Sequence, residues 1–128
     1  MADERIRLAL VGAGATGSPL LELLLGHNHI VDVVMVVDSR PDAPGMAVAR
    51  AHGIPTAEDI TQVMRLKEKV DLIVDVTGDP GVKTALRLQL QLQNNRHTVI
   101  MHEKIVLLIL SLMQGKLVSG HETSKDYA

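Results

Sequence analysis

The sequence of 128 residues has no cysteine, tryptophan or phenylalanine, and Tyr127 is its single aromatic residue. Without cysteine the chain can form no disulfide, thiolate metal site, redox dithiol or cysteine nucleophile. A single aromatic side chain provides no stacking platform for single-stranded nucleic acid. The 13 basic and 15 acidic side chains give a formal net charge of -2, so there is no broad basic field either. We therefore expect no nucleic-acid partner.

Long hydrophobic runs are also missing. The longest uninterrupted apolar run, from Ile105 to Leu110, is far shorter than the roughly 20 residues that cross a bilayer. Residues 1–5 lack the apolar core of a secretion signal. These features predict a cytoplasmic protein with no membrane partner, and the length fits one globular domain.

Apolar segments alternate with helical segments along the chain. The segment from Ile6 to Val11 is nearly continuously apolar and stops at a glycine cluster, which is typical of a strand buried on both faces. Four further strands are predicted at 30–37, at 54–55 as a short or edge strand, at 70–76 and at 98–101. Helices are predicted over 20–25, 45–51, a segment that buries Ile60, Val63 and Met64, 80–93 and 105–113.

Three local signals refine these helices. Gly26 and Gly53 follow predicted helices at the position that a left-handed cap prefers. Thr56 and Asp59 form a weak capping box ahead of the third helix. Residues 86–93 alternate with period two, yet each of them is a good helix former, and we predict a helix there.

Five strand-then-helix units in succession predict an α/β fold with three layers. The expected core is one doubly wound parallel sheet with strand order 3-2-1-4-5 and helices on both faces. Residues 1–115 form this predicted domain, and residues 116–128 are expected to be a polar, flexible tail. Ligands of such sheets bind outside the carboxyl ends of the strands, so the loops at 12–17, 38–44, 77–80 and 102–104 share the expected binding rim.

The segment from Gly12 to Gly17 has the spacing G-x-G-x-x-G between a predicted strand and a predicted helix. Gly12 would make the tight turn, Gly14 would let a pyrophosphate approach the backbone N–H groups, and Gly17 would allow close packing of the helix. Asp38 ends the second strand 21 residues after Gly17, where a carboxylate accepts hydrogen bonds from an adenosine ribose. The alternative is that the glycines only make a tight turn in a domain that has no ligand.

Residues 5–104 resemble the amino-terminal, Rossmann-type domain of the glucose-fructose oxidoreductase and inositol dehydrogenase family, and of aspartate and homoserine dehydrogenases. The resemblance lies in the glycine loop and Asp38, in the strand at 70–76 with its Thr-Gly-Asp-Pro loop, and in Glu103 and Lys104. It implies a dinucleotide site formed by Gly12, Gly14, Ala15, Thr16, Gly17, Asp38, Ser39, Arg40, Thr77, Gly78, Asp79, Pro80 and Glu103. It also implies that Lys104 lies beside the reacting carbon, although Ile105 stands where the family has proline.

The resemblance covers only the cofactor half of that family. The family's substrate-binding sheet and catalytic histidine lie in a second domain, whereas about 24 residues follow Lys104 here. The resemblance therefore implies an NAD(P)-binding domain of oxidoreductase type whose catalysis needs a missing or separate substrate domain. The segment at 37–45 and the loop at 76–80 are also similar to domains found ahead of bacterial signalling modules, which suggests a non-catalytic dinucleotide sensor. The loop at 14–19 is similar to that of adenylating enzymes, which use ATP.

The choice of cofactor depends on three neighbouring residues. Asp38 would repel a 2′-phosphate and so favours NAD, whereas Ser39 and Arg40 offer the hydroxyl and guanidinium that NADP readers use. We expect NAD, with NADP as the alternative. His102 precedes Glu103 on the rim and is a second catalytic candidate beside Lys104, because a histidine titrates near neutrality. No metal site is expected, since the histidines at 27 and 29 have no evident third ligand.

The predicted helix at 105–113 is more apolar than one sheet face requires. Ser111 is its single polar position among residues 106–113. This pattern suggests that the helix contacts a second subunit in a homodimer, or a missing substrate or signalling domain. The alternative is a fully buried terminal helix.

Overall fold

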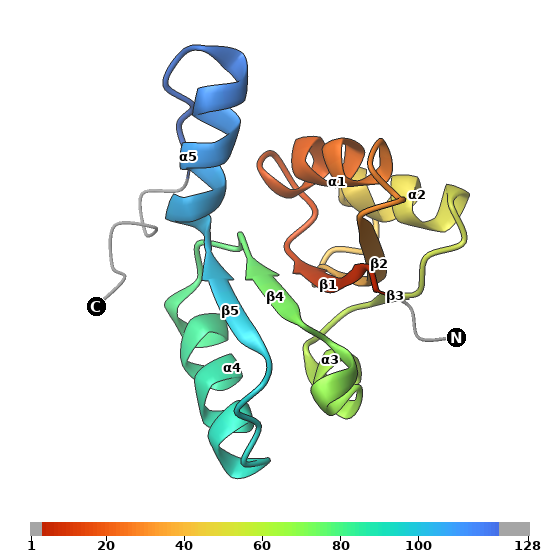
Figure 1. Ribbon diagram of the computed structural model, residues 1–128, viewed down its shortest axis with the longest axis vertical. Helices are drawn as coiled ribbons and strands as arrows, with labels where there is room; N and C mark the ends of the chain where they lie inside the picture. Colours follow the sequence, from red (N-terminus) through yellow and green to blue (C-terminus); the bar gives the residue numbers. More distant parts are fainter. Residues whose placement is uncertain (1–3, 121–128) are drawn as a thin grey trace.

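The computed structural model describes residues 4–120 and contains one parallel sheet between two layers of helices (Figure 1). The strands are β1 (Ile6–Val11), β2 (Val31–Val37), β3 (Thr56–Ala57), β4 (Leu72–Asp75) and β5 (Val99–His102). The helices are α1 (Gly17–Leu25), α2 (Pro44–Ala51), α3 (Thr61–Arg65), the short 3-10 helix η1 (Lys67–Lys69), α4 (Pro80–Leu92) and α5 (Glu103–Gln114).

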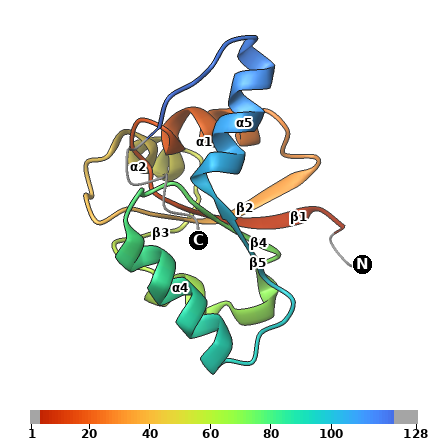
Figure 2. The same ribbon diagram turned by 90° about the vertical axis from the view of Figure 1, so that its left-hand side faces the viewer.

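The strand order is β3-β2-β1-β4-β5, which confirms the predicted topology. All four strand pairs are parallel. Because the chain crosses back from the β3 edge to pair β4 with β1, the topological switch point lies between β1 and β4. α1, α2 and α5 cover one face of the sheet, and α4 covers the other (Figure 2).

Two hydrophobic cores lie on the two faces of the sheet. In β1, Leu8 and Leu10 pack with residues of α1, α2 and α5, whereas Ala9 and Val11 pack with residues of α3 and α4. This division follows from the alternation of side chains along a strand, and it explains why β1 is apolar at consecutive positions. The register between β1 and β2 shifts after Leu8.

The ambiguous segment at 86–93 lies in α4 up to Leu92, so the prediction of a helix is confirmed. The helix begins as expected, because the Asp79 side chain accepts a hydrogen bond from the Gly81 N–H at 2.8 Å and Pro80 occupies the first helical position.

Two cap predictions, at Gly26 and at Thr56, were wrong, and the third strand begins two residues later than predicted. Gly26 has φ -70°, so it is not a left-handed cap, whereas Gly53 has φ +70° and confirms the prediction for that position. Thr56 does not cap a helix, because it lies in β3 and pairs with Val36 of β2. β3 covers residues 56–57, whereas the edge strand was predicted at 54–55. Asp59 alone accepts a hydrogen bond from the Thr61 N–H at the start of α3.

Residues beyond Gly115 run back along α5 as far as the structure describes them. The Val118 N–H donates to the Ser111 hydroxyl at 2.9 Å, and the Val118 side chain packs against the core beneath α5. Residues 121–128 of the predicted flexible tail lie outside the described residues. Within 4–120, no helix is long and apolar enough to cross a membrane.

Candidate nucleotide site

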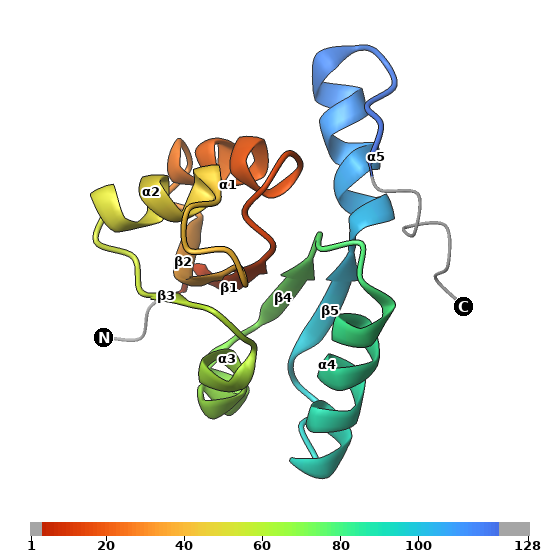
Figure 3. The same cartoon turned by 180° about the vertical axis from the view of Figure 1, so that it is seen from behind.

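The glycine loop follows β1 at the switch point of the sheet (Figure 3). A Cβ atom at Gly17 would lie 1.9 Å from the carbonyl oxygen of Gly12, so only glycine fits there. Gly12 has φ +105° and lies against the backbone that follows β4. The two glycines therefore let the loop fold back on itself and let α1 begin directly above it.

The space beside Gly14 is limited for a different reason. An added Cβ would meet the side chain of Arg40, with Nη2 at 2.8 Å, and no backbone atom within 4 Å. The fold thus leaves an approach to the Gly14 backbone that a flexible side chain now covers. No side chain caps the first turn of α1, which starts three residues later. Within that turn the Ser18 N–H donates to the Gly14 carbonyl at 2.9 Å, the Leu20 N–H donates to the Thr16 carbonyl at 3.4 Å, and Pro19 has no N–H. Gly17 carries the remaining N–H of the turn, at the position where helix starts bind anions.

Asp38 lies directly after β2 and is only 7% exposed. Its Oδ2 accepts a hydrogen bond from the Ala13 N–H at 2.8 Å, and its Oδ1 accepts one from the Arg40 N–H at 2.9 Å. The Arg40 side chain adds Nε to Oδ1 at 3.1 Å and Nη2 to Oδ2 at 3.2 Å. Burial by itself would raise the pKa of Asp38, but these hydrogen bonds outweigh it and lower the pKa below its ordinary value. Asp38 is therefore an ionised carboxylate attached to the glycine loop.

The loop after β4 is held by its own side chains. Asp75 is buried, and its Oδ1 accepts hydrogen bonds from the Thr77 hydroxyl at 2.7 Å and from the Thr77 N–H at 3.0 Å. The Thr77 hydroxyl oxygen in turn accepts from the Asp79 N–H at 3.1 Å. Gly78 has φ +68°, which lets the chain turn from β4 into α4.

These loops surround a cavity of about 640 Å³. Of the predicted cofactor residues, the cavity is lined by Gly12, Gly14, Ala15, Asp38, Ser39, Arg40, Thr77 and Asp79. Thr16, Gly17, Gly78 and Pro80 belong to the same loops but not to the lining, and Glu103 lies elsewhere. Drug-sized ligands occupy cavities of comparable volume.

One wall of the cavity was not predicted from the sequence. Glu58, Asp59 and Ile60 follow β3 and line the cavity together with Val82 and Ala85 of α4. The residues that follow the carboxyl end of a parallel strand reach the rim of the sheet. Because the third strand was predicted two residues too early, residues 58–60 were not expected at this rim. The signal available in the sequence was the position of Pro55, which favours a strand that begins after it.

The two catalytic candidates lie at the end of β5, outside the cavity lining. His102 pairs in register with Asp75, and Arg87 Nη2 lies 3.4 Å from His102 Nε2. Burial lowers the pKa of His102, and the charges of Arg87 and Lys83 lower it further, against the opposing effect of Asp75. His102 is therefore neutral at pH 7. Glu103 is buried at the start of α5, whereas Lys104 is exposed.

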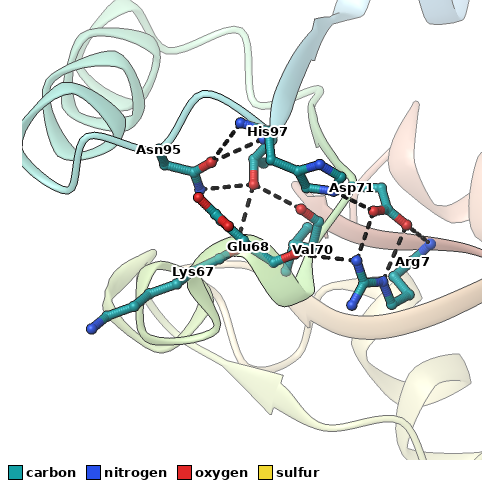
Figure 4. Close-up of polar contacts among 8 residues, drawn as sticks. Arg7, Lys67, Glu68, Val70, Asp71, Asn95 and His97 are labelled. Carbon is teal, nitrogen blue, oxygen red and sulfur yellow. Dashed lines mark hydrogen bonds and ion pairs between the residues drawn. The ribbon is translucent and has the colours of Figure 1, made fainter. Parts of the chain in front are cut away.

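A second polar cluster lies at the opposite, amino end of the strands (Figure 4). Asp71 accepts hydrogen bonds from the Arg7 N–H and from the Arg7 guanidinium at 2.8 Å each, and it lies 2.6 Å from His97 Nε2. These contacts join the starts of β1, β4 and β5. Ligands of open parallel sheets bind at the carboxyl ends of the strands. We therefore interpret this cluster as a set of contacts that stabilises the sheet.

Comparisons with known proteins relate the chain to dehydrogenases in sequence and in fold. No protein-family profile matches the chain. The chain is 29% identical over 78 residues to acetaldehyde dehydrogenase of Roseiflexus sp., which covers 61% of this chain and 26% of the relative. It is 30% identical over 98 residues to acetaldehyde dehydrogenase 2 of Azotobacter vinelandii, a match that covers 66% of this chain and 32% of that relative. The chain thus spans about a quarter to a third of the length of these curated relatives.

Two solved structures share the fold. The WlbA dehydrogenase of Chromobacterium violaceum, in complex with NADH and UDP-GlcNAcA, superposes with a TM-score of 0.61 and 19% identity over 91% of this chain and 34% of its own. GenD2 from gentamicin A biosynthesis, in complex with NAD, superposes with a TM-score of 0.54 and 20% identity. The match covers 77% of this chain and 34% of GenD2. This chain has a Rossmann-type fold. Both neighbours are longer than this Rossmann-type unit, which matches about a third of each of them.

Proposed function

We propose that the chain is the NAD-binding domain of an oxidoreductase. The observation that carries the proposal is a buried, ionised Asp38 joined to the glycine loop, with both on the wall of one cavity. This is the arrangement that a dinucleotide fingerprint requires. The sequence similarity to acetaldehyde dehydrogenases and the NAD and NADH in the structural neighbours support the same function.

Each part of the cavity suits one part of the dinucleotide. Asp38 accepts hydrogen bonds from the adenosine ribose, and the backbone of the loop from Gly14 to Gly17 receives the pyrophosphate. The apolar side chains of Ile60 and Val82 provide contacts for the adenine. When bound, NAD supplies the hydride chemistry, and the chain's own residues bind and orient it.

The charge around the cavity favours NAD over NADP. The lining holds four carboxylates, those of Asp38, Glu58, Asp59 and Asp79, against the single guanidinium of Arg40. A 2′-phosphate adds negative charge to the ligand beside Asp38, and like charges at close range repel.

The substrate pocket belongs to a further domain in this proposal. His102 and Lys104 remain the candidates within this chain, and they lie at the end of β5, outside the cavity lining. A neutral His102 can accept a proton from a substrate hydroxyl. The resemblance to two-domain oxidoreductases, whose substrate pocket lies in the second domain, is the reason for this division.

Calorimetric titration with NAD, NADH, NADP, NADPH and ATP tests the proposal. We expect NAD and NADH to bind more tightly than the phosphorylated forms. Binding of ATP alone would instead favour an adenylating function, and an absence of binding to any of these ligands would overturn the proposal.

Gly14→Val is the matching variant. Its side chain fills the approach to the backbone and meets only the flexible end of Arg40, so we expect a folded protein whose affinity for NAD falls at least tenfold. Gly26→Val makes the same exchange at the end of α1, where the nearest atom is 3.4 Å away, and should bind NAD normally. An unchanged affinity in Gly14→Val would contradict a phosphate site at this loop.

A further inference from the structure

The hydrogen bonds of Asp38 leave its carboxylate saturated. A carboxylate has about four lone-pair positions for hydrogen bonds. Four donors already point to Asp38: the Ala13 N–H, the Arg40 N–H, and Nε and Nη2 of the Arg40 side chain. A ribose hydroxyl therefore finds no acceptor on Asp38 while the Arg40 guanidinium remains in this position.

The four donors differ in how easily they can leave. The Ala13 and Arg40 N–H groups belong to the backbone of the loops and are part of the fold. The guanidinium is the end of a flexible side chain that is 63% exposed. Its two contacts are also distributed in a particular way, because Nε bonds Oδ1 and Nη2 bonds Oδ2. Withdrawal of this one side chain thus frees one lone pair on each oxygen.

We infer that Arg40 occupies the position of the adenosine ribose in the free protein and that the 2′,3′-diol of NAD replaces its guanidinium on Asp38, donor for donor. This inference rests on the proposed function. A vicinal diol and a guanidinium fork both present two donors side by side, so the exchange leaves Asp38 with four hydrogen bonds. The same movement uncovers Gly14, because Nη2 lies 2.8 Å from the position of a Cβ there.

The displaced guanidinium keeps a negatively charged surrounding. Asp42 already acts on Arg40 through its charge, and Glu58 and Asp59 line the same cavity. Arg40 thereby sets both affinity and selectivity. It competes with the ribose of NAD, and its charge offsets that of Asp38 when the ligand carries a 2′-phosphate that cannot replace it as a donor.

The test is the affinity of Arg40→Gln for NAD and NADP, measured by calorimetry beside the wild type. Loss of a competing, largely exposed ion pair should tighten NAD binding about two- to fivefold. The same substitution should weaken NADP binding, because Asp38 then faces the 2′-phosphate without a neighbouring cation. Arg96→Gln removes the same charge from an exposed turn before β5 and should change neither affinity.

A pair of fragments isolates the diol. ADP presents both ribose hydroxyls, whereas 2′-deoxy-ADP presents one, so the gain in affinity caused by Arg40→Gln should be larger for ADP. An equal gain for both fragments, or NAD binding to Arg40→Gln that is unchanged or weaker, would overturn the exchange. If neither the wild type nor Arg40→Gln binds NAD, the proposed function itself fails, which is a different result.

Discussion

At the scale of single residues, the three glycines of the loop have different tasks. Gly17 and Gly12 are required by the backbone, since a side chain at Gly17 would overlap the Gly12 carbonyl. Gly14 meets only the end of Arg40, so its small size matters for what approaches the loop from outside. Substitutions at Gly17 should therefore affect folding, and substitutions at Gly14 should affect binding.

Gly17→Ala should lower the free energy of unfolding by about 3 kcal/mol or more, because its Cβ overlaps backbone that cannot move without shifting α1. Urea denaturation measures this loss. Gly26→Ala is the matched control: its φ of -70° suits any residue, so we expect no loss and a gain of at most about 1 kcal/mol. Equal stability of the two variants would show that the loop can open at Gly17.

Asp71 should make stability depend on pH. Hydrogen bonds from the Arg7 side chain and N–H, and from His97, lower the pKa of Asp71 well below its ordinary value. A lowered pKa in the native state stabilises the fold above the unfolded pKa of about 4, and this stabilisation is lost as the pH falls toward the native value. Asp71→Asn should thus be less stable than the wild type at pH 7, and the difference should shrink below about pH 4.

Urea denaturation of both proteins at pH 7 and pH 2 checks this expectation. Asp32→Asn serves as a control, because Asp32 and Arg5 form a 3.6 Å ion pair in which both side chains are more than a third exposed. Its difference from the wild type should be small at both pH values. A difference for Asp71→Asn that is the same at pH 7 and pH 2 would contradict the assignment.

At the scale of elements, α4 shows how packing resolves an ambiguous pattern. Alternating leucines at 86, 88, 90 and 92 would all lie on one face of a strand. In the helix, Leu86 is fully buried in the core against β1 and α3, whereas Leu88 is 49% exposed. The same residue type at neighbouring positions therefore contributes differently to stability.

Leu86→Ala should cost about 2–4 kcal/mol of unfolding free energy, because it leaves a cavity in the core. Leu88→Ala should cost less than about 1 kcal/mol, since solvent already reaches that side chain. Thermal and urea denaturation of the two variants compare them directly. Similar losses would indicate that both leucines share a buried face.

At the scale of the whole molecule, α5 exposes five large apolar side chains: Ile105, Leu108, Ile109, Leu112 and Met113. Val106 and Leu110 pack into the core, so the helix is anchored, but it is not fully buried as one expectation had it. Four of the five exposed side chains, at 105, 108, 109 and 112, follow the spacing of one helical stripe, and Lys104 is exposed at its beginning. We propose that this stripe packs against the same stripe of a second copy, because pairing two identical apolar stripes about a two-fold axis removes both from water.

Sedimentation over a range of concentrations tests the dimer. Leu112→Lys places a charge in the stripe at a side chain that is 74% exposed, so it should reduce dimerisation without lowering the unfolding temperature of the monomer. Leu117→Lys is the control, since Leu117 is 89% exposed and lies outside the stripe. A wild-type chain that remains monomeric at the highest concentrations would contradict the proposal.

The architecture could be predicted from the amino-acid sequence alone. Strands at consecutive apolar positions, helices at period 3.6 and glycines between them are local signals, and the handedness of parallel crossovers leaves few topologies for five such units. The glycine loop and Asp38 were also readable, because a fixed spacing between strand and helix places them at the same rim.

The contacts of Asp38 and the walls of the cavity could not be predicted without the three-dimensional structure. The bond between Arg40 and Asp38 depends on the path of a side chain, and the wall at 58–60 depends on the exact start of β3. His102 lies away from the cavity because of its direction from β5 toward Arg87. Such features arise from contacts between residues far apart in the chain or from rotamers, and neither leaves a period or a spacing in the sequence.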